Sequence, residues 1–261
     1  MSTEPEILFE TGADGIAWLT FNRPAARNAM TMGMYDRIGE LCEQLASQPS
    51  VRVLLLRGRG DKAFVAGTDI SQFRDFRTED DALAYEARMT GVLDALEELS
   101  IPTIAVIHGA CTGGGAAIAA ACDLRIGAPS ARFGFPIART LGNTLSTRNL
   151  ARLAGLLGVA KTKDLLFLAR LMDADEMLAA GLLSEVVPAE RLYERAEAIA
   201  RVLLDHAPIT LRTCKSELLR VLRGWAPEDG RQHVIDAYMS EDFKEGIEAF
   251  LAKRSPRWQG K

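Results

Sequence analysis

Cysteine is scarce in this 261-residue chain, and the cysteines that are present form no CxxC pair. The four are scattered at Cys42, Cys111, Cys122 and Cys214, and three of them lie within apolar stretches. Such a distribution favours reduced, buried thiols in a cytoplasmic protein over a disulfide framework or a metal site. We therefore expect no metal-binding residues.

A surplus of basic residues and a long apolar run are missing as well. The net charge of −4 gives no electrostatic reason to expect nucleic acid or an anionic membrane as a partner. No apolar run reaches the length that spans a membrane. The opening "MSTEPEILFE" has neither the basic start nor the apolar core of a signal peptide. The chain length allows one large globular domain, or one domain with a smaller extension.

Strand-like and helix-like segments alternate through the first part of the chain. The segments "EILFET" and "GIAWLTFNR" predict a hairpin around a "GADG" turn. Thr31 is expected to cap a helix that runs to about Ser47, and a further amphipathic helix is expected from about Asp80. The runs "VRVLLLRGR", "IPTIAVIHG" and "DLRIGAP" predict strands, the first two of them buried. This rhythm predicts an α/β fold.

Helices joined by short turns are expected after about Asn149, with a break at Gly181 and a short β segment after it. From this change in character we predict a core over residues 1–200 and a helical carboxy-terminal region over residues 201–261. The boundary is a soft one, placed between about residue 195 and residue 205.

Two glycine-containing turns follow predicted strands. One is "AFVAGTDI"; the other, "HGACTGGGAAI", opens an alanine-rich helix whose free N–H groups favour a developing negative charge. Neither turn fits a phosphate-binding pattern, since no GKS or GKT follows the glycines and GxGxxG does not occur. One N–H from each turn would instead suit a carbonyl oxygen that becomes an oxyanion. Each such donor lowers the barrier by about 3–4 kcal/mol.

Four longer motifs connect the chain to a known family. In order, they are "FNRPAARNAM", "AFVAGTDISQF", "IPTIAVIHGACTGGGAAIAAACDLRIGAPSARFGFP" and "SEDFKEGIEAFLAKRSPRWQGK". In order and spacing these motifs resemble the crotonase superfamily, which is the enoyl-CoA hydratase/isomerase family, over nearly the whole chain. The resemblance implies a spiral of ββα units with carboxy-terminal helices, assembled as homotrimers or dimers of trimers. It also implies an acyl-CoA substrate, with coenzyme A as part of the substrate and no tightly bound cofactor.

The same resemblance assigns site residues by motif position. The backbone N–H groups of Thr68 and Gly114 are expected to form an oxyanion hole for the thioester carbonyl. Ala66, Asp69 and Ile70 are expected to border the adenine and pantetheine. Further substrate contacts are expected at Arg27, Gly113, Ala117, Pro136, Ile137, Asn143, Phe250 and Lys253. Of these, Phe250 and Lys253 are expected to reach the coenzyme A of a neighbouring subunit, although Lys253 also fits a solvated helix end.

The sequence departs from the family at the two positions where hydratases carry glutamates. One lies three residues after the oxyanion glycine and holds Ala117; the other follows the proline of "FGFPIARTLG" and holds Ile137. Neither side chain can hold or move a proton, and each positioned acid–base group accelerates a reaction by about 10²–10⁴-fold. The resemblance therefore does not carry over the standard two-glutamate hydration. The carboxylate that isomerases commonly use near the second position is missing too.

Arg139, in the segment after this motif, is a candidate for binding a substrate carboxylate. A guanidinium cannot act as a base at neutral pH, but it binds a carboxylate through two hydrogen bonds. A surface or intersubunit salt bridge is the alternative interpretation of Arg139.

Other ionisable residues near the motifs are interpreted as structural. Asp69 is expected to organise its turn through backbone hydrogen bonds, and His108, Cys111 and Asp123 are expected to pack or to bond locally. Glu86 could reach inward from its predicted helix, although a charge on the helix face is the simpler interpretation.

Two functional hypotheses follow. The first is an acyl-CoA enzyme that stabilises a thioester enolate and catalyses isomerisation, decarboxylation, hydrolysis or an atypical hydration. The second is a non-catalytic acyl-CoA-binding or assembly protein on the same scaffold. The polar segment from Arg139 to Ser146 favours the enzyme. A serine peptidase is disfavoured because no Ser–His–Asp set lies near the turns.

Overall fold

The structure of the protein is a computed structural model that describes residues 4–73, 79–140, 142–224 and 256–261, together with residues 241, 242, 245, 249, 252 and 254. The strands are β1 (Ile7–Thr11), β2 (Ile16–Phe21), β3 (Val53–Gly58), β4 (Ala63–Val65), β5 (Thr103–Ile107), β6 (Ala110–Thr112), β7 (Leu124–Gly127), β8 (Arg132–Gly134) and β9 (Glu185–Val186). The helices are α1 (Met32–Ala46), α2 (Glu79–Glu97), α3 (Gly114–Ala121), α4 (Ile137–Thr140), α5 (Thr147–Phe167), α6 (Ala174–Ala179), α7 (Leu192–Leu204) and α8 (Pro208–Leu222). Short 3₁₀ helices are η1 (Pro24–Ala26), η2 (Ile70–Phe73) and η3 (Ala189–Arg191), and α5 is kinked at Gly158.

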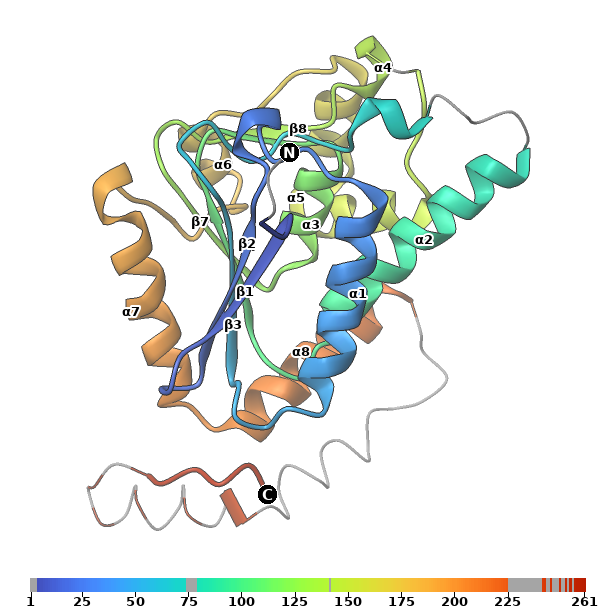
Figure 1. Ribbon diagram of the computed structural model, residues 1–261. Helices are drawn as coiled ribbons and strands as arrows, with labels where there is room; N and C mark the ends of the chain where they lie inside the picture. Colours follow the sequence, from blue (N-terminus) through green and yellow to red (C-terminus); the bar gives the residue numbers. More distant parts are fainter. Residues whose placement is uncertain are drawn as a thin grey trace.

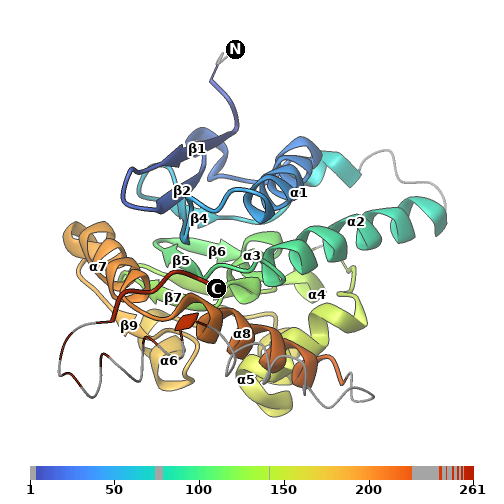
Figure 2. The ribbon, with the colours of Figure 1, turned by 90° about the horizontal axis from the view of Figure 1, so that it is seen from below.

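Two sheets are built from strands that alternate along the chain. The larger sheet has the order β1-β2-β3-β5-β7-β9 and the smaller one the order β4-β6-β8. Strands β1 and β2 form the predicted antiparallel hairpin, and the other neighbours pair parallel. Each of β3, β5 and β7 is followed by a strand of the smaller sheet and then by a helix (Figure 2). This alternation is the ββα repeat, so the predicted spiral is confirmed.

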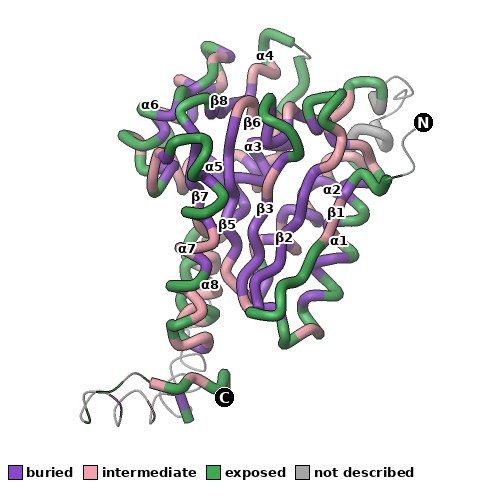
Figure 3. Tube along the Cα trace, turned by 60° about the vertical axis from the view of Figure 1, so that its left-hand side comes forward, coloured by how far each residue is buried: buried purple, intermediate pink, exposed green. Residues whose placement is uncertain are grey.

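The larger sheet is buried on both faces. Successive side chains of its strands point to opposite sides, and the two sets pack into two separate apolar cores. In β2, Ala17, Leu19 and Phe21 belong to one apolar core, and Ile16 and Trp18 belong to the other. Helix α7 covers the second face, while α1, α2 and α3 lie on the other side of the sheet (Figure 1). Buried residues accordingly follow the central strands (Figure 3). The strand ends that carry the glycine turns are therefore anchored in a packed core.

Most elements lie where the sequence pattern places them. Thr31 caps α1, its hydroxyl accepting the N–H of Met34 at 3.3 Å. The three predicted strands are β3, β5 and β7. Two differences stand out. Short strands, β4 and β6, lie where only turns were predicted. Helix α7 spans the soft boundary and packs on the larger sheet, and the division into a core and a carboxy-terminal region stays a prediction.

Two general features can be stated for the described part of the chain. None of its helices has the length and apolar character needed to cross a membrane. It contains no cluster of three or more His, Cys, Asp or Glu side chains arranged to hold a metal ion.

Candidate functional site

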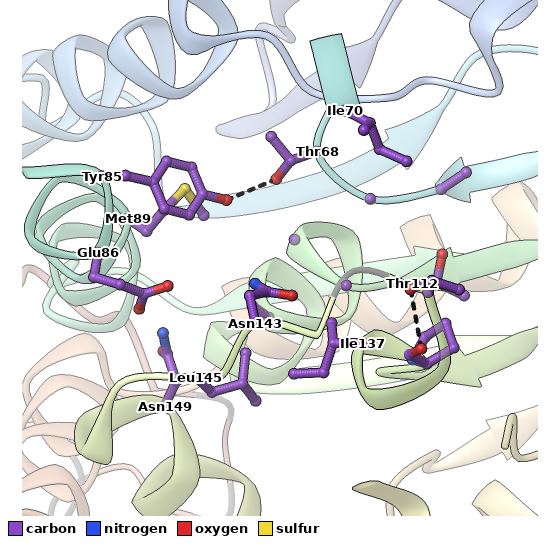
Figure 4. A pocket seen from close by; sticks show the side chains of 17 residues that line it. Thr68, Ile70, Tyr85, Glu86, Met89, Thr112, Ile137, Asn143, Leu145 and Asn149 are labelled. Atoms are coloured by element: carbon purple, nitrogen blue, oxygen red, sulfur yellow. Dashed lines mark hydrogen bonds between the residues drawn. The ribbon is translucent and has the colours of Figure 1, made fainter. Parts of the chain in front are cut away.

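A pocket opens between the amino-terminal half of α2, the start of α3 and the segment that joins α4 to α5 (Figure 4). Its volume is about 210 Å³. Backbone from both glycine turns contributes to its walls, together with a mostly apolar set of side chains. The lining residues are Ala66, Gly67, Thr68, Ile70, Tyr85, Glu86, Met89, Thr112, Gly113, Gly114, Ala117, Pro136, Ile137, Thr140, Asn143, Leu145 and Asn149.

The first glycine turn follows β4 and is tied to the chain at Met30. The N–H of Met30 donates to the carbonyl of Gly67, and the N–H of Asp69 donates to the carbonyl of Met30, both at 2.8 Å. Successive N–H groups of extended backbone point to opposite sides of the chain. The N–H of Thr68 therefore points away from Met30.

The motif "FNRPAARNAM" supports this turn through Asn28. That side chain is fully buried; its amide donates to the carbonyl of Ala63 at 2.8 Å, and its oxygen accepts the N–H of Arg23 at 3.0 Å. The carbonyl of Arg27 accepts the N–H of Ala66 at 3.1 Å. Arg27 thus contributes backbone to the turn, and its side chain is exposed outside the pocket lining.

The second glycine turn joins β6 to α3. Gly113 has φ 53° and ψ −119°, a conformation that side-chain-bearing residues rarely adopt. Its N–H donates to the carbonyl of Gly134 at 2.9 Å. Gly114 is the first residue of α3, so its N–H has no acceptor within the helix. The free N–H of this turn therefore belongs to Gly114.

The two turns lie against each other at the pocket. A Cβ built on Gly113 would lie 3.5 Å from the Cα of Gly67, and one on Gly114 would lie 3.1 Å from the hydroxyl oxygen of Thr68. Among the described residues, neither the N–H of Thr68 nor that of Gly114 donates to a protein acceptor. Two unpartnered donors at one edge of a pocket fit a ligand oxygen that carries negative charge.

A chain of hydroxyl groups runs beside these donors. The hydroxyl of Thr68 lies 2.8 Å from that of Tyr35. It also lies 3.0 Å from that of Tyr85 (Figure 4). Burial raises the pKa of both tyrosines, so both keep their protons at neutral pH. A side chain at Gly114 would collide with the Tyr35 hydroxyl. The sequence analysis missed Tyr35, for which the available signal was a tyrosine on the otherwise apolar face of α1.

Comparison with known proteins decides the family. The family model described as enoyl-CoA hydratase/isomerase matches residues 11–261. The chain belongs to the enoyl-CoA hydratase/isomerase family. A short-chain-enoyl-CoA hydratase of Clostridium acetobutylicum is 33% identical to it over 247 residues, with 92% of each chain covered. A crotonyl-CoA hydratase of Syntrophomonas wolfei is 34% identical over 263 residues, with 94% of this chain and 95% of the relative covered.

Solved structures of the same family have the same fold. An enoyl-CoA hydratase/carnithine racemase from Magnetospirillum magneticum superposes with a TM-score of 0.91 at 31% identity, covering 99% of this chain and 97% of that one. An enoyl-CoA hydratase from Bacillus anthracis superposes with a TM-score of 0.87 at 29% identity, covering 98% and 100%. The crotonase fold therefore extends over the described chain.

Several residues expected to bind the substrate lie together in the pocket of this family member. Ala117 and Ile137, at the positions where the resemblance predicts the hydratase glutamates, line it with hydrocarbon. Seven more of the expected residues also line it: Ala66, Thr68, Ile70, Gly113, Gly114, Pro136 and Asn143.

Other expected residues lie elsewhere. Arg139 is exposed on α4 and does not line the pocket, whereas Ile137 on the same helix does. This position favours the alternative of a surface or intersubunit salt bridge, and the carboxylate clamp stays an untested prediction. Asp69 also lies outside the lining, and its carboxylate accepts the N–H and hydroxyl of Ser71 and pairs with Arg23. Phe250 and Lys253 lie outside the described residues.

For Glu86 the structure supports the interpretation in which its side chain reaches inward from the helix (Figure 4). Its carboxylate lines the pocket, so its interpretation as a charge on the helix face is wrong. Burial raises the pKa of Glu86, and the N–H of Ser146, 3.2 Å from Oε2, offsets part of that effect. The sequence places Glu86 directly after Tyr85 on a predicted helix. The helical period alone does not show which face of that helix meets the pocket.

Asp123, Cys111 and His108 are all packed away from the pocket, but the structural hydrogen bond expected for His108 is not formed, because neither of its ring nitrogens has a hydrogen-bond partner among the described residues. Asp123 accepts the N–H of Thr103 at 2.7 Å and pairs with Lys215 at 2.8 Å. Cys111 is fully buried, and burial raises the pKa of its thiol well above the usual range. His108 is buried in the core under α7, away from the pocket, with its ring edge-on to Tyr193.

Proposed function

We propose that this family member is an acyl-CoA enzyme that holds the thioester carbonyl oxygen between the N–H groups of Thr68 and Gly114. Electrons that move onto this oxygen produce an enolate, which the two donors stabilise. The observation that supports the proposal is the pair of N–H groups, without protein acceptors, from two turns in contact at the pocket. The relatives' names, which refer to CoA thioesters, point to the same substrate class.

The two-glutamate hydration of the family does not follow from this site. Ala117 and Ile137 bring hydrocarbon to the positions from which water would be activated and protons delivered. The reaction classes that remain are those that pass through an enolate or a tetrahedral oxyanion: isomerisation, decarboxylation, hydrolysis and an atypical hydration.

The decisive test removes the N–H of Gly114 and separates the effect of that loss from the effect of a steric clash with Tyr35. Any side chain at Gly114 meets the Tyr35 hydroxyl, so the comparison is made in a Tyr35→Phe background. Gly114→Pro lacks the N–H and fits the first position of a helix, whereas the matched control Gly114→Ala keeps it. We expect acyl-CoA turnover to be about 10²–10³-fold lower with proline than with alanine. Equal turnover would contradict the hole.

A measurement on the wild type makes the test independent of folding in the variants. Two donors on the carbonyl oxygen weaken the C=O bond of a bound thioester, so its isotope-edited infrared stretch should fall in frequency on binding. An unshifted stretch in the bound ligand would count against the proposal.

A second candidate is an acyl-CoA-binding protein without catalysis, favoured by the hydrocarbon at both glutamate positions. A panel of CoA thioesters followed by mass spectrometry separates the two. Turnover of any member supports the enzyme, and binding of several members with turnover of none supports the binding protein.

The assembly into homotrimers or dimers of trimers stays a prediction from the family. Large apolar side chains exposed on α5, on α6 and between them are available for such contacts: Val159, Phe167, Leu168, Leu171 and Leu178.

A further inference from the structure

Glu86 differs from every other described residue that lines the pocket. The others offer hydrocarbon, amide, thioether, hydroxyl or backbone groups, and none of them exchanges a proton near neutral pH. The phenols of Tyr35 and Tyr85 are held in their protonated forms by burial, which raises the pKa of each. Glu86 is therefore the one carboxylate among the described lining residues.

The surroundings of Glu86 favour its protonated form more than water does. Apolar neighbours in the pocket include Met89, one turn further along α2, and Leu145. No described Lys or Arg lies within ion-pair distance of Glu86, and burial raises the pKa of its carboxyl. A carboxyl of this kind binds and releases a proton closer to neutral pH than an ordinary glutamate does.

The charged and titratable groups on the packed elements are accounted for. On α2 the neighbours are Tyr85, which is protonated, and Arg88, which is exposed and pairs with Asp36 of α1 at 2.9 Å. On α5, Arg148 and Arg152 are paired with Asp94 and with Glu97 further along α2. On α4, Arg139 is exposed outside the pocket lining.

Its carboxylate is also held in place. The N–H of Ser146, the residue that caps α5, donates to Oε2. The hydroxyl of Ser146 in turn lies 3.2 Å from that of Thr90 on α2. Figure 4 shows the carboxylate directed from α2 into the pocket. One oxygen is therefore fixed by the cap, which leaves the other for a ligand.

We propose that Glu86 is the proton-transfer group of this site, a role that rests on the proposed function. Its carboxylate takes a proton from C2, the acyl carbon next to the thioester carbonyl. The C–H electron pair becomes the C1–C2 double bond, and the carbonyl pair moves onto the oxygen held by Thr68 and Gly114. The protonated Glu86 then returns the proton to C2, or to C4 where a C3–C4 double bond extends the enolate.

A single carboxylate limits the reaction. Water addition requires one group to deprotonate water and a second to protonate carbon, whereas proton movement along the acyl chain requires only one group that reverses its role. The site therefore suits thioesters whose conversion is a proton transfer, and no co-reactant is needed.

The experiment measures proton transfer apart from binding. Butyryl-CoA, which has no double bond to shift, is incubated with the protein in D₂O, and deuterium at C2 is followed by mass spectrometry. We expect exchange with the wild type and a loss of about 10²–10⁴-fold in Glu86→Gln. Its Kd for butyryl-CoA should stay within about threefold of wild type. Glu43→Gln, an exposed glutamate on α1, is the matched control and should exchange like the wild type.

The outcomes separate this inference from the proposed function. Exchange in Glu86→Gln within about threefold of wild type, with loss in the Gly114→Pro variant, would keep the oxyanion hole and overturn the role of Glu86. Binding by the wild type without any exchange would overturn both. The wild-type pH profile needs no variant: the exchange rate should rise with one ionisation above the ordinary glutamate value of 4.5. A profile flat above that value would overturn the role of Glu86.

Discussion

The two ends of α2 place carboxylates in opposite surroundings. Toward its amino terminus, Glu86 faces an apolar pocket with no cation at ion-pair distance among the described residues. At its carboxyl end lie three carboxylates, and three guanidinium groups from α5 and the end of α8 surround them. These six residues are Asp94, Glu97 and Glu98, with Arg148, Arg152 and Arg223.

The difference separates a carboxylate that holds the fold from one that is free to react. Arg152, whose side chain is 5% exposed, contacts both oxygens of Glu97 at 2.6 and 2.8 Å and reaches Asp94 at 3.0 Å. These ion pairs connect α2, α5 and the end of α8. Among the described residues, Glu86 accepts a hydrogen bond from the backbone N–H of Ser146, and burial raises the pKa of its carboxyl.

Breaking the paired end gives the largest expected effect. Arg152→Ala removes the buried guanidinium that contacts both oxygens of Glu97 and reaches Asp94, while the other two guanidinium groups of the cluster remain beside them. Hydrogen bonds to charged groups contribute about 1.5–3 kcal/mol, and we expect a loss of unfolding free energy of that size. Urea unfolding followed by circular dichroism measures the loss. The control is Arg37→Ala, which removes an exposed pair with Glu40 and is expected to cost at most about 1 kcal/mol. Equal losses in the two variants would refute the stabilising role of the cluster.

Placing a cation beside Glu86 would give this carboxylate a charged partner like those of the carboxylates at the other end of α2. Asn143 is exposed and lines the pocket, so Asn143→Lys can bring an ammonium group to the Glu86 carboxylate. A nearby positive charge lowers the pKa of a carboxyl, and we expect the midpoint of the exchange–pH profile to move down by about one pH unit. Thr144→Lys, at the exposed neighbour outside the lining, is the control and should leave the midpoint in place. The same shift in both variants would point to a general effect of charge.

Neutralising Glu86 should give the smallest effect, and a stabilising one. A pKa raised in the folded state means that the unfolded chain loses this proton first as pH rises, so the ionised carboxylate disfavours folding at neutral pH. Glu86→Gln removes that charge and keeps an acceptor for Ser146. We expect Tm to rise by about 1–3 °C near neutral pH, and the gain to shrink as pH falls toward 4.5. A lower Tm than in Glu43→Gln at neutral pH would show that the charge is stabilising.

Local patterns determined much of the architecture. The apolar runs of β3 and β5, the hairpin of β1 and β2 and the Thr31 cap of α1 each depend on neighbours within a few residues, so they could be read from the chain. The short strands β4 and β6 could not, because three residues carry too little periodicity and pair only with distant segments.

The sequence by itself determined the backbone of the site: glycines at the start of α3, and hydrocarbon at the two positions where relatives place glutamates. Which polar side chains meet that backbone was decided only by tertiary structure. Arg139 faces solvent, while Tyr35 reaches the hydroxyl of Thr68 from α1 and Glu86 lines the same pocket from α2. The reason is geometric: a glycine turn sets its own N–H directions, whereas the direction of a side chain on a helix depends on how that helix packs against the rest of the molecule.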